Sequence, residues 1–263
     1  MSAGWLMTRE ALADAVRRRI ALVVAAFALV SLFFIDTCTS CSPTITAQGQ
    51  ELAVQQIAGA GGIAVALVLS LWSMVLGGIL ASDHLAEPLD DGSAQLLLAR
   101  PVPRETYALT RLTGAWLLAA LTAALLLGSA AVLLALRQEL PAAPMLGAWL
   151  ACVAGAWTVG ALAMAASLWL PRAVTALLVF GGVWLLAGLE VAARLGADVS
   201  GTAALIDRFG PPLASGILLA LAGWIEPAAQ IQGSGVAVAL RAAVWCVASA
   251  ALLALGFRRI ELR

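Results

Sequence analysis

The sequence has 263 residues, of which 62% are hydrophobic and only 11% are charged, and its formal net charge is zero. Soluble domains carry about a quarter charged residues, so the composition excludes an ordinary soluble domain and indicates a polytopic membrane protein. A net charge of zero provides no general attraction to nucleic acid, so we expect no nucleic-acid partner.

A polar segment opens the chain and ends in an Arg-Arg-Arg run. Apolar residues recur along it at helical spacing, namely Trp5, Leu6, Leu12 and Val16. We therefore expect residues 1–19 to form an amphipathic helix along the cytoplasmic interface, with an ordinary solvated helix as the alternative. No small-residue cleavage site follows, so the first apolar run is expected to remain as a helix.

Long apolar runs follow this segment. A helix that crosses a bilayer needs about 20 mainly apolar residues. By that measure the sequence predicts six spans, at about Ile20–Ile35, Gly59–Ala81, Tyr107–Leu136, Met145–Leu170, Ala173–Ala193 and Val236–Gly256. Only Pro171 and Arg172 divide the fourth span from the fifth, which predicts a tight turn. The predicted fold is all-α, with one transmembrane domain over residues 1–263.

A further apolar piece, Pro211–Ile225, lies in the predicted external loop at residues 195–235. It is short, contains Gly and Pro, and is bounded by charged residues. We expect a re-entrant or interfacial hairpin before the last span, and a seventh span is the alternative.

Arginine alone sets the predicted orientation, because the chain contains no lysine. Most arginines fall on one side of the six-span arrangement, in the N-terminal segment, between the second and third spans, and at the C-terminal end. The positive-inside rule makes this side cytoplasmic. Both termini are then expected inside, and a seventh span would put the arginine-rich C-terminus outside. The alanine-rich, lysine-free composition suggests a bacterial source, for which we expect the inner membrane.

The longest polar segment expected on the cytoplasmic side covers residues 82–106. From Glu87 it reads EPLDDGSAQLLLARPVPRE. The segment is too short to fold as a domain, so we expect it to offer a docking surface to another protein. Its Leu-Leu-Leu cluster would lie on a short helix between Gly92 and Pro101, which suits a hydrophobic groove on a cytoplasmic partner.

This segment resembles the one that follows the second membrane helix of ABC type-2 permeases. That family commonly has Glu, then Gly-Thr, Leu-Leu, Arg-Pro-Val-Ser-Arg and finally Gly-Lys. Ser93, Pro103 and Arg111 stand here in place of the usual Thr, Ser and Lys. The six expected spans, the two cytoplasmic ends and the apolar piece before the last span extend the resemblance over nearly the whole chain.

The resemblance implies the membrane subunit of an ABC exporter, expected as a homodimer that couples to two copies of an ATP-binding subunit. The contact set with that subunit would be Glu87, Asp90, Gly92, Gln95, Leu97, Arg100 and Arg104. ATP and Mg would bind to the partner, because a phosphate-binding loop needs a lysine that this sequence lacks. We expect no cofactor, metal or catalytic residue in this chain. The implied cargo is hydrophobic or amphipathic, and the alternative is a non-transporting scaffold or an assembly or maturation subunit.

Charged residues near the outer ends of the spans form a second candidate site. Glu190 and Arg194 lie four apart in the fifth span and are predicted to pair. Together with Asp36, which closes the first span, they are candidates for an outer vestibule that meets a substrate headgroup. Structural ion pairs and snorkelling side chains are the alternative.

Cysteine and histidine give weaker signals. Cys38 and Cys41 lie in the first external loop, where a structural disulfide is the main expectation and a metal or redox role the alternative. Cys152 and Cys246 fall in apolar spans and are expected to be small packing residues. The only histidine, His84, is expected in a solvated cytoplasmic loop.

Overall fold

The computed structural model describes residues 54–90, 103–138, 140–195, 201–224 and 234–259, with a few residues before them. Those few are Ala26, Val30, Phe33 and the residues of two paired strands, β1 (Thr46–Ala47) and β2 (Gln50–Glu51). The other described elements are helices, so the fold is all-helical apart from this small antiparallel pair.

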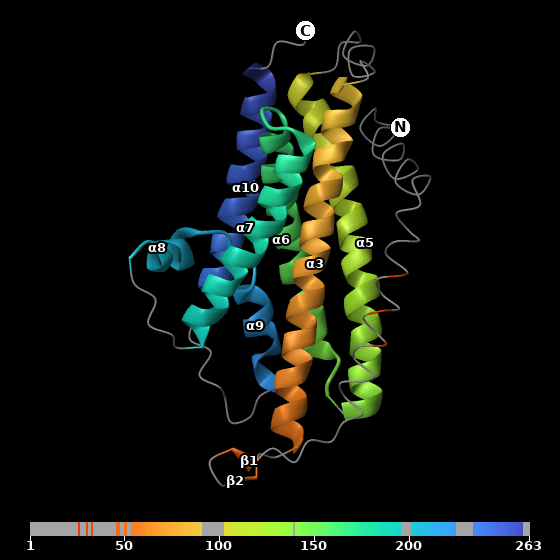
Figure 1. The fold of residues 1–263 in the computed structure, drawn as a ribbon, viewed down its shortest axis with the longest axis vertical. Helices are drawn as coiled ribbons and strands as arrows, with labels where there is room; N and C mark the ends of the chain where they lie inside the picture. Colours follow the sequence, from red (N-terminus) through yellow and green to blue (C-terminus); the bar gives the residue numbers. More distant parts are fainter. Residues whose placement is uncertain are drawn as a thin grey trace.

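Long helices dominate the fold and run side by side along its long axis (Figure 1). They are α3 (Val54–Asp90), α5 (Arg104–Gln138), α6 (Ala143–Ser167), α7 (Arg172–Arg194) and α10 (Gly235–Arg259). Shorter helices lie between α7 and α10, namely α8 (Thr202–Phe209), α9 (Ser215–Leu221) and the 3-10 helix η1 (Ala222–Trp224).

Five helices are long and apolar enough to cross a membrane. Their spanning parts are Gly59–Ala86, Arg104–Leu136, Ala143–Ser167, Arg172–Arg194 and Gly235–Arg259. This confirms a multi-pass membrane protein and matches five of the spans predicted from the sequence. The predicted first span at Ile20–Ile35 and the interfacial helix at residues 1–19 lie outside the described residues, apart from three helical positions within that span.

Helix α6 lies at the centre of the bundle and packs against α3, α5, α7, α9 and α10. Its most apolar stretch is 61% buried, whereas the corresponding stretches of α7 and α10 are each 17% buried. Small buried residues such as Ala148, Cys152 and Ala156 let neighbouring helices approach α6 closely.

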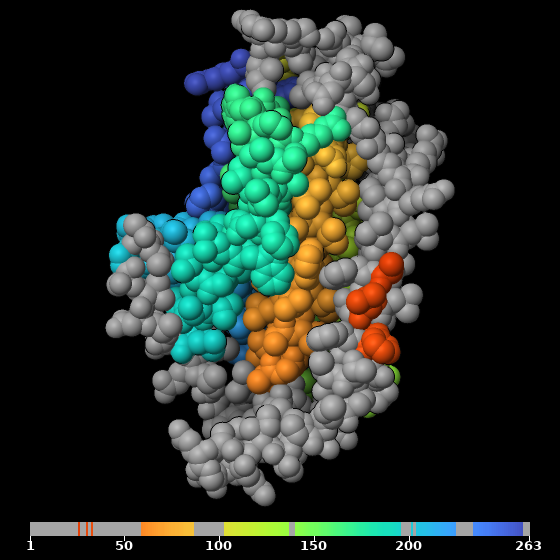
Figure 2. Space-filling view, in the orientation of Figure 1, coloured from red at the N-terminus to blue at the C-terminus, as the bar shows by residue number. Residues whose placement is uncertain are grey.

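The outer helices present apolar side chains to the surroundings. Figure 2 shows α7 and α3 covering one face of the molecule. The exposed residues of α7 include Val174, Leu177, Leu178 and Leu185. An apolar exterior of this extent is expected where lipid, rather than water, surrounds the protein.

Helix α3 continues beyond the end that hydropathy predicts. The predicted span stops at Ala81, but the helix runs to Asp90, so the first part of the expected polar segment at residues 82–106 is helical. Leu85 is fully buried and His84 is 7% exposed. The expectation of a solvated loop at His84 is therefore wrong. Packing of this turn against α5 and α6, in a cluster with Tyr107, Leu112 and Met164, explains why the helix continues.

The apolar piece before the last span contains a short helix. Ser215–Trp224 is apolar and helical, and this described stretch alone is too short to cross a bilayer. Ile217, Leu218 and Leu221 are buried, and α9 packs against α6.

Candidate functional site

The predicted docking segment joins α3 to α5 at one end of the bundle. Glu87 and Asp90 belong to the last turns of α3, whereas Gly92, Gln95, Leu97 and Arg100 lie outside the described residues. Arg104 is exposed and begins α5. Of the predicted contact set, the structure therefore gives the side-chain environment of Arg104 alone.

An ion pair ties the start of α5 to the end of α10 beside Arg104. Arg258 Nη2 donates to Glu105 Oε1 at 2.6 Å and lies 2.5 Å from Oε2. The Arg258 side chain is 57% exposed and that of Glu105 is 34% exposed. Solvent and salt screen such a pair, so it fixes the relative position of two helix ends more than it stabilises the fold.

An aromatic cluster lies under this ion pair. Tyr107 is fully buried and stacks on Phe257, with ring centroids 6.1 Å apart. The Arg111 guanidinium lies 5.4 Å from the centre of the Tyr107 ring, a distance at which cation–π attraction acts. The cluster joins the first turns of α5 to the end of α10.

The turn between α6 and α7 lies at the same end (Figure 1). Helix α6 ends at Ser167 and α7 begins at Arg172, which confirms the predicted tight turn. Trp169 in this turn is 63% exposed, and Arg172 is exposed as well. This end of the bundle therefore combines an exposed indole with exposed arginines, namely Arg104, Arg172, Arg258 and Arg259.

Glu190 forms the second candidate site, toward the opposite end of α7. Its side chain is buried, and Oε2 accepts hydrogen bonds from Ala214 N at 2.7 Å, Ser215 N at 2.8 Å and Ser215 Oγ at 3.0 Å. These backbone N–H groups open α9 and have no partner within that helix. The carboxylate of α7 thus satisfies the first turn of α9.

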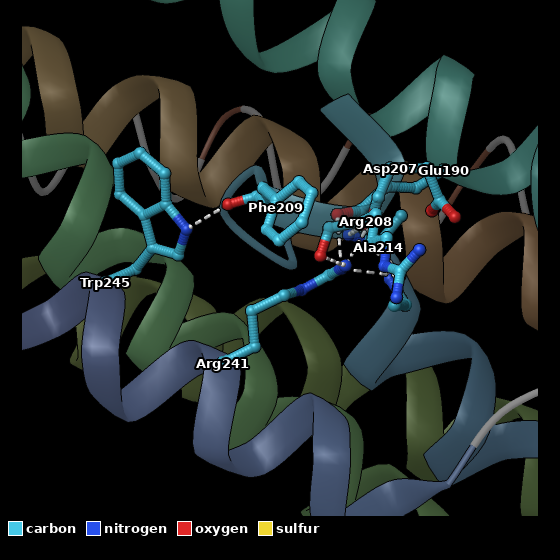
Figure 3. A network of polar contacts seen from close by, with 8 residues as sticks. Glu190, Asp207, Arg208, Phe209, Ala214, Arg241 and Trp245 are labelled. Carbon is cyan, nitrogen blue, oxygen red and sulfur yellow. Dashed lines mark hydrogen bonds and ion pairs between the residues drawn. The ribbon is translucent and has the colours of Figure 1, made fainter. Parts of the chain in front are cut away.

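Arg241 of α10 completes this network (Figure 3). Its Nη2 donates to Glu190 Oε1 at 3.1 Å, and its Nη1 donates to the backbone carbonyl oxygens of Asp207 and Arg208. One turn later on α10, Trp245 Nε1 donates to the carbonyl oxygen of Phe209 at 2.8 Å. These carbonyl groups belong to the last turn of α8, which has no further helical donors for them.

The charges of this network match the helix ends that they meet. The N-terminus of a helix carries partial positive charge and its C-terminus partial negative charge. Glu190 lies at the N-terminus of α9, and Arg241 lies at the C-terminus of α8. We call these two side chains, with Trp245, the clamp, and residues 207–215 that they hold the elbow.

The clamp corrects one sequence prediction. The spacing of four residues predicted an ion pair between Glu190 and Arg194. In the structure Glu190 instead pairs with Arg241 of α10, 51 residues further along the chain. Arg194 is half-buried in the last turn of α7, and Asp36 lies outside the described residues. The role of these residues in an outer vestibule stays a prediction, and the buried Glu190 carboxylate is already engaged by the elbow and Arg241.

Two of the four cysteines lie in the part of the chain that the structure describes. Cys38 and Cys41 lie outside the described residues. Cys152 is buried and free, with its Sγ 3.5 Å from the Ser70 carbonyl oxygen, as expected for a packing residue. Among the described residues, no group of three His, Cys, Asp or Glu side chains could hold a metal ion.

Comparison with known proteins identifies no family for this chain, because no family model and no curated protein matches it.

Proposed function

We propose that this chain is the membrane-spanning permease subunit of an ABC transporter. It forms a homodimer and couples ATP hydrolysis, carried out with Mg by two separate ATP-binding subunits, to export of a hydrophobic or amphipathic substrate. The proposal is supported by the likeness of residues 87–114 to ABC type-2 permeases and by the five spanning helices.

The single observation that carries the proposal is how the docking segment is anchored. It joins the two longest helices of the described residues, α3 with 37 residues and α5 with 35 residues, which pack directly on each other and on α6. At 1.5 Å per residue each helix is about 50–55 Å long. Movement of a partner against the segment would therefore be passed to two rigid helices that extend through the membrane.

The orientation follows from the charges at the two ends. We place the end with Arg104, Arg172, Arg258 and Arg259 in the cytoplasm, in keeping with the positive-inside rule. The chain then has both termini inside, and α9 is a re-entrant helix that enters from the outer side. A short helix at membrane depth needs partners for its terminal backbone groups, and Glu190 provides them for α9.

The test is a pull-down of the full chain from its native membrane after solubilisation in detergent. The wild type is compared with a variant that carries Glu87→Arg and Arg104→Glu, and ATPase activity is measured in the eluate. A matched control is Arg208→Glu, which reverses an exposed arginine on α8, far along the chain from the docking segment.

We expect ATPase activity to copurify with the wild type and with the Arg208→Glu control and to be lost with the double variant. Loss of activity with all variants alike would point to a general defect in assembly. Absence of an ATPase from the wild-type eluate would contradict the proposal and favour a non-transporting scaffold.

A further inference from the structure

The two oxygens of Glu190 serve different helices. Oε2 accepts its hydrogen bonds from Ala214 and Ser215 of the elbow, whereas Oε1 accepts one from Arg241 of α10. If Arg241 moved away, the carboxylate would keep three donors and α9 would keep its capped first turn. Arg241 Nη2 also makes a longer contact with Ser215 Oγ, at 3.4 Å. The three hydrogen bonds between Glu190 and the elbow do not themselves involve Arg241.

Within the part of the chain that the structure describes, little of the first part of α10 is buried. Within Gly235–Trp245 only Val238 is buried, and it lies beside Gly216 of α9. From Cys246 onward α10 is fastened to α6, since Trp157 Nε1 donates to the Cys246 carbonyl oxygen at 3.1 Å and Ser249, Leu253 and Phe257 are buried. Among the described residues, the polar contacts of Arg241 and Trp245 and the packing of Val238 attach the first part to the elbow and α9.

Release of Arg241 would take the counter-charge away from the buried Glu190 carboxylate, which would keep its hydrogen bonds from Ala214 and Ser215. This cost favours the latched state. The Arg241 side chain is already 16% exposed, and a long arginine side chain can extend toward the membrane surface. The last turn of α8 is also exposed at Arg208 and Phe209, so solvent or lipid headgroups can reach its carbonyl groups.

We propose that the clamp is a conformational latch. Arg241 and Trp245 hold Gly235–Trp245 of α10 against the elbow in one state and release it in another, while Glu190 keeps α9 in place in both. The part of α10 from Cys246 onward stays on α6, so the helix bends or swings near Trp245. The latch requires neither the ATPase nor a substrate. Its test is therefore independent of the test of the proposed function.

The two charges of the latch cannot be exchanged, because each side chain also bonds backbone groups that the other could not. Arginine cannot accept hydrogen bonds from the N–H groups of Ala214 and Ser215, and glutamate cannot donate to the carbonyl groups of Asp207 and Arg208. Exchanging the two charges in Glu190→Arg with Arg241→Glu should therefore fail to restore the latch, although the pair would remain oppositely charged.

The first experiment measures the position of α10 by the distance between two spin labels. The labels replace Leu185 of α7 and Leu240 of α10, which are 64% and 63% exposed, in a full chain whose native cysteines are replaced. We expect one main distance in the latched chain and an added population at longer distance in Arg241→Gln. Arg258→Gln, which removes the ion pair at the other end of the same helix, is the matched control and should leave the distribution unchanged.

The second experiment measures hydrogen exchange of the elbow amides. We expect Glu190→Gln to speed exchange at Ala214 and Ser215 by about tenfold, and Arg241→Gln to leave it near the wild-type rate. Trp245→Phe, a milder change, should add a smaller long-distance population than Arg241→Gln and keeps the test available if the latter folds poorly. Unchanged label distances in both α10 variants, or full restoration of the distances by the charge exchange, would overturn the latch.

Discussion

Gly77 of α3 faces Ala119 of α5 so closely that a Cβ atom added to Gly77 would lie 2.7 Å from the Cβ atom of Ala119. Real Cβ atoms do not approach to this distance. The two helices can therefore pack this closely only because Gly77 has no side chain. This contact fixes α3 against α5, the two helices that the proposed docking segment connects.

Replacing Gly77 with alanine should therefore destabilise the protein. The added methyl group forces the two helices apart, and overpacking of this kind costs about 1–3 kcal/mol. The measurement is thermal unfolding of the purified variant in detergent. The matched control is Gly61→Ala on the same helix, where no atom of the described residues lies within 4 Å of the added Cβ atom.

The Gly61→Ala control should be neutral or slightly stabilising, since alanine favours a helix over glycine by about 0.5–1 kcal/mol. Equal unfolding temperatures for the two variants would contradict the close contact at Gly77.

The ion pair between Glu105 and Arg258 should make a small, salt-dependent contribution. Glu105→Gln and Arg258→Gln are expected to lower the unfolding temperature by similar small amounts at low salt, and the double variant by no more than either one. At about 1 M salt the differences should disappear because the charges are screened. Additive effects that persist in high salt would show that the two side chains do not depend on each other.

Trp224 should contribute more to the free energy of unfolding than an exposed tryptophan does. Its ring is 5% exposed and lies over Gly62, and its Nε1 donates to the Pro141 carbonyl oxygen at 3.0 Å. Trp224→Phe removes the donor and part of the packed ring, which should cost about 1–3 kcal/mol of unfolding free energy. Trp169→Phe, at a site 63% exposed, is the comparison and should have little effect on thermal unfolding. A larger loss of thermal stability in Trp169→Phe than in Trp224→Phe would contradict this prediction.

Hydropathy predicted the spans well because one simple requirement, enough apolar length to cross a bilayer, sets them. The predicted turn at Pro171 and Arg172 was also correct, since α6 ends at Ser167 and α7 begins directly after Pro171. The end of α3 was not predictable in the same way. Polar residues after Ala81 suggested a loop, but Leu85 and His84 are buried against neighbouring helices, and this packing continues the helix to Asp90.

The partner of Glu190 could not be found from spacing alone. Arg194 lies one turn away on the same helix, and local spacing favours it. Arg241 comes close to Glu190 only because α7, α9 and α10 meet, and it is Ala214 and Ser215 that require a carboxylate at that point. The sequence does show that Glu190 and Arg241 are ionisable residues of opposite sign near the ends of apolar spans, which was the available signal.

The most direct measurement of the central claim is photocrosslinking from the docking segment in intact native membranes. A photoreactive amino acid replaces Leu97, and in a control chain it replaces the exposed Leu205 of α8. The proposed function predicts a crosslinked product from Leu97 that contains an ATP-binding subunit and is absent from the Leu205 chain. An ATPase-free set of products from Leu97, in membranes where the chain is folded and abundant, would contradict it.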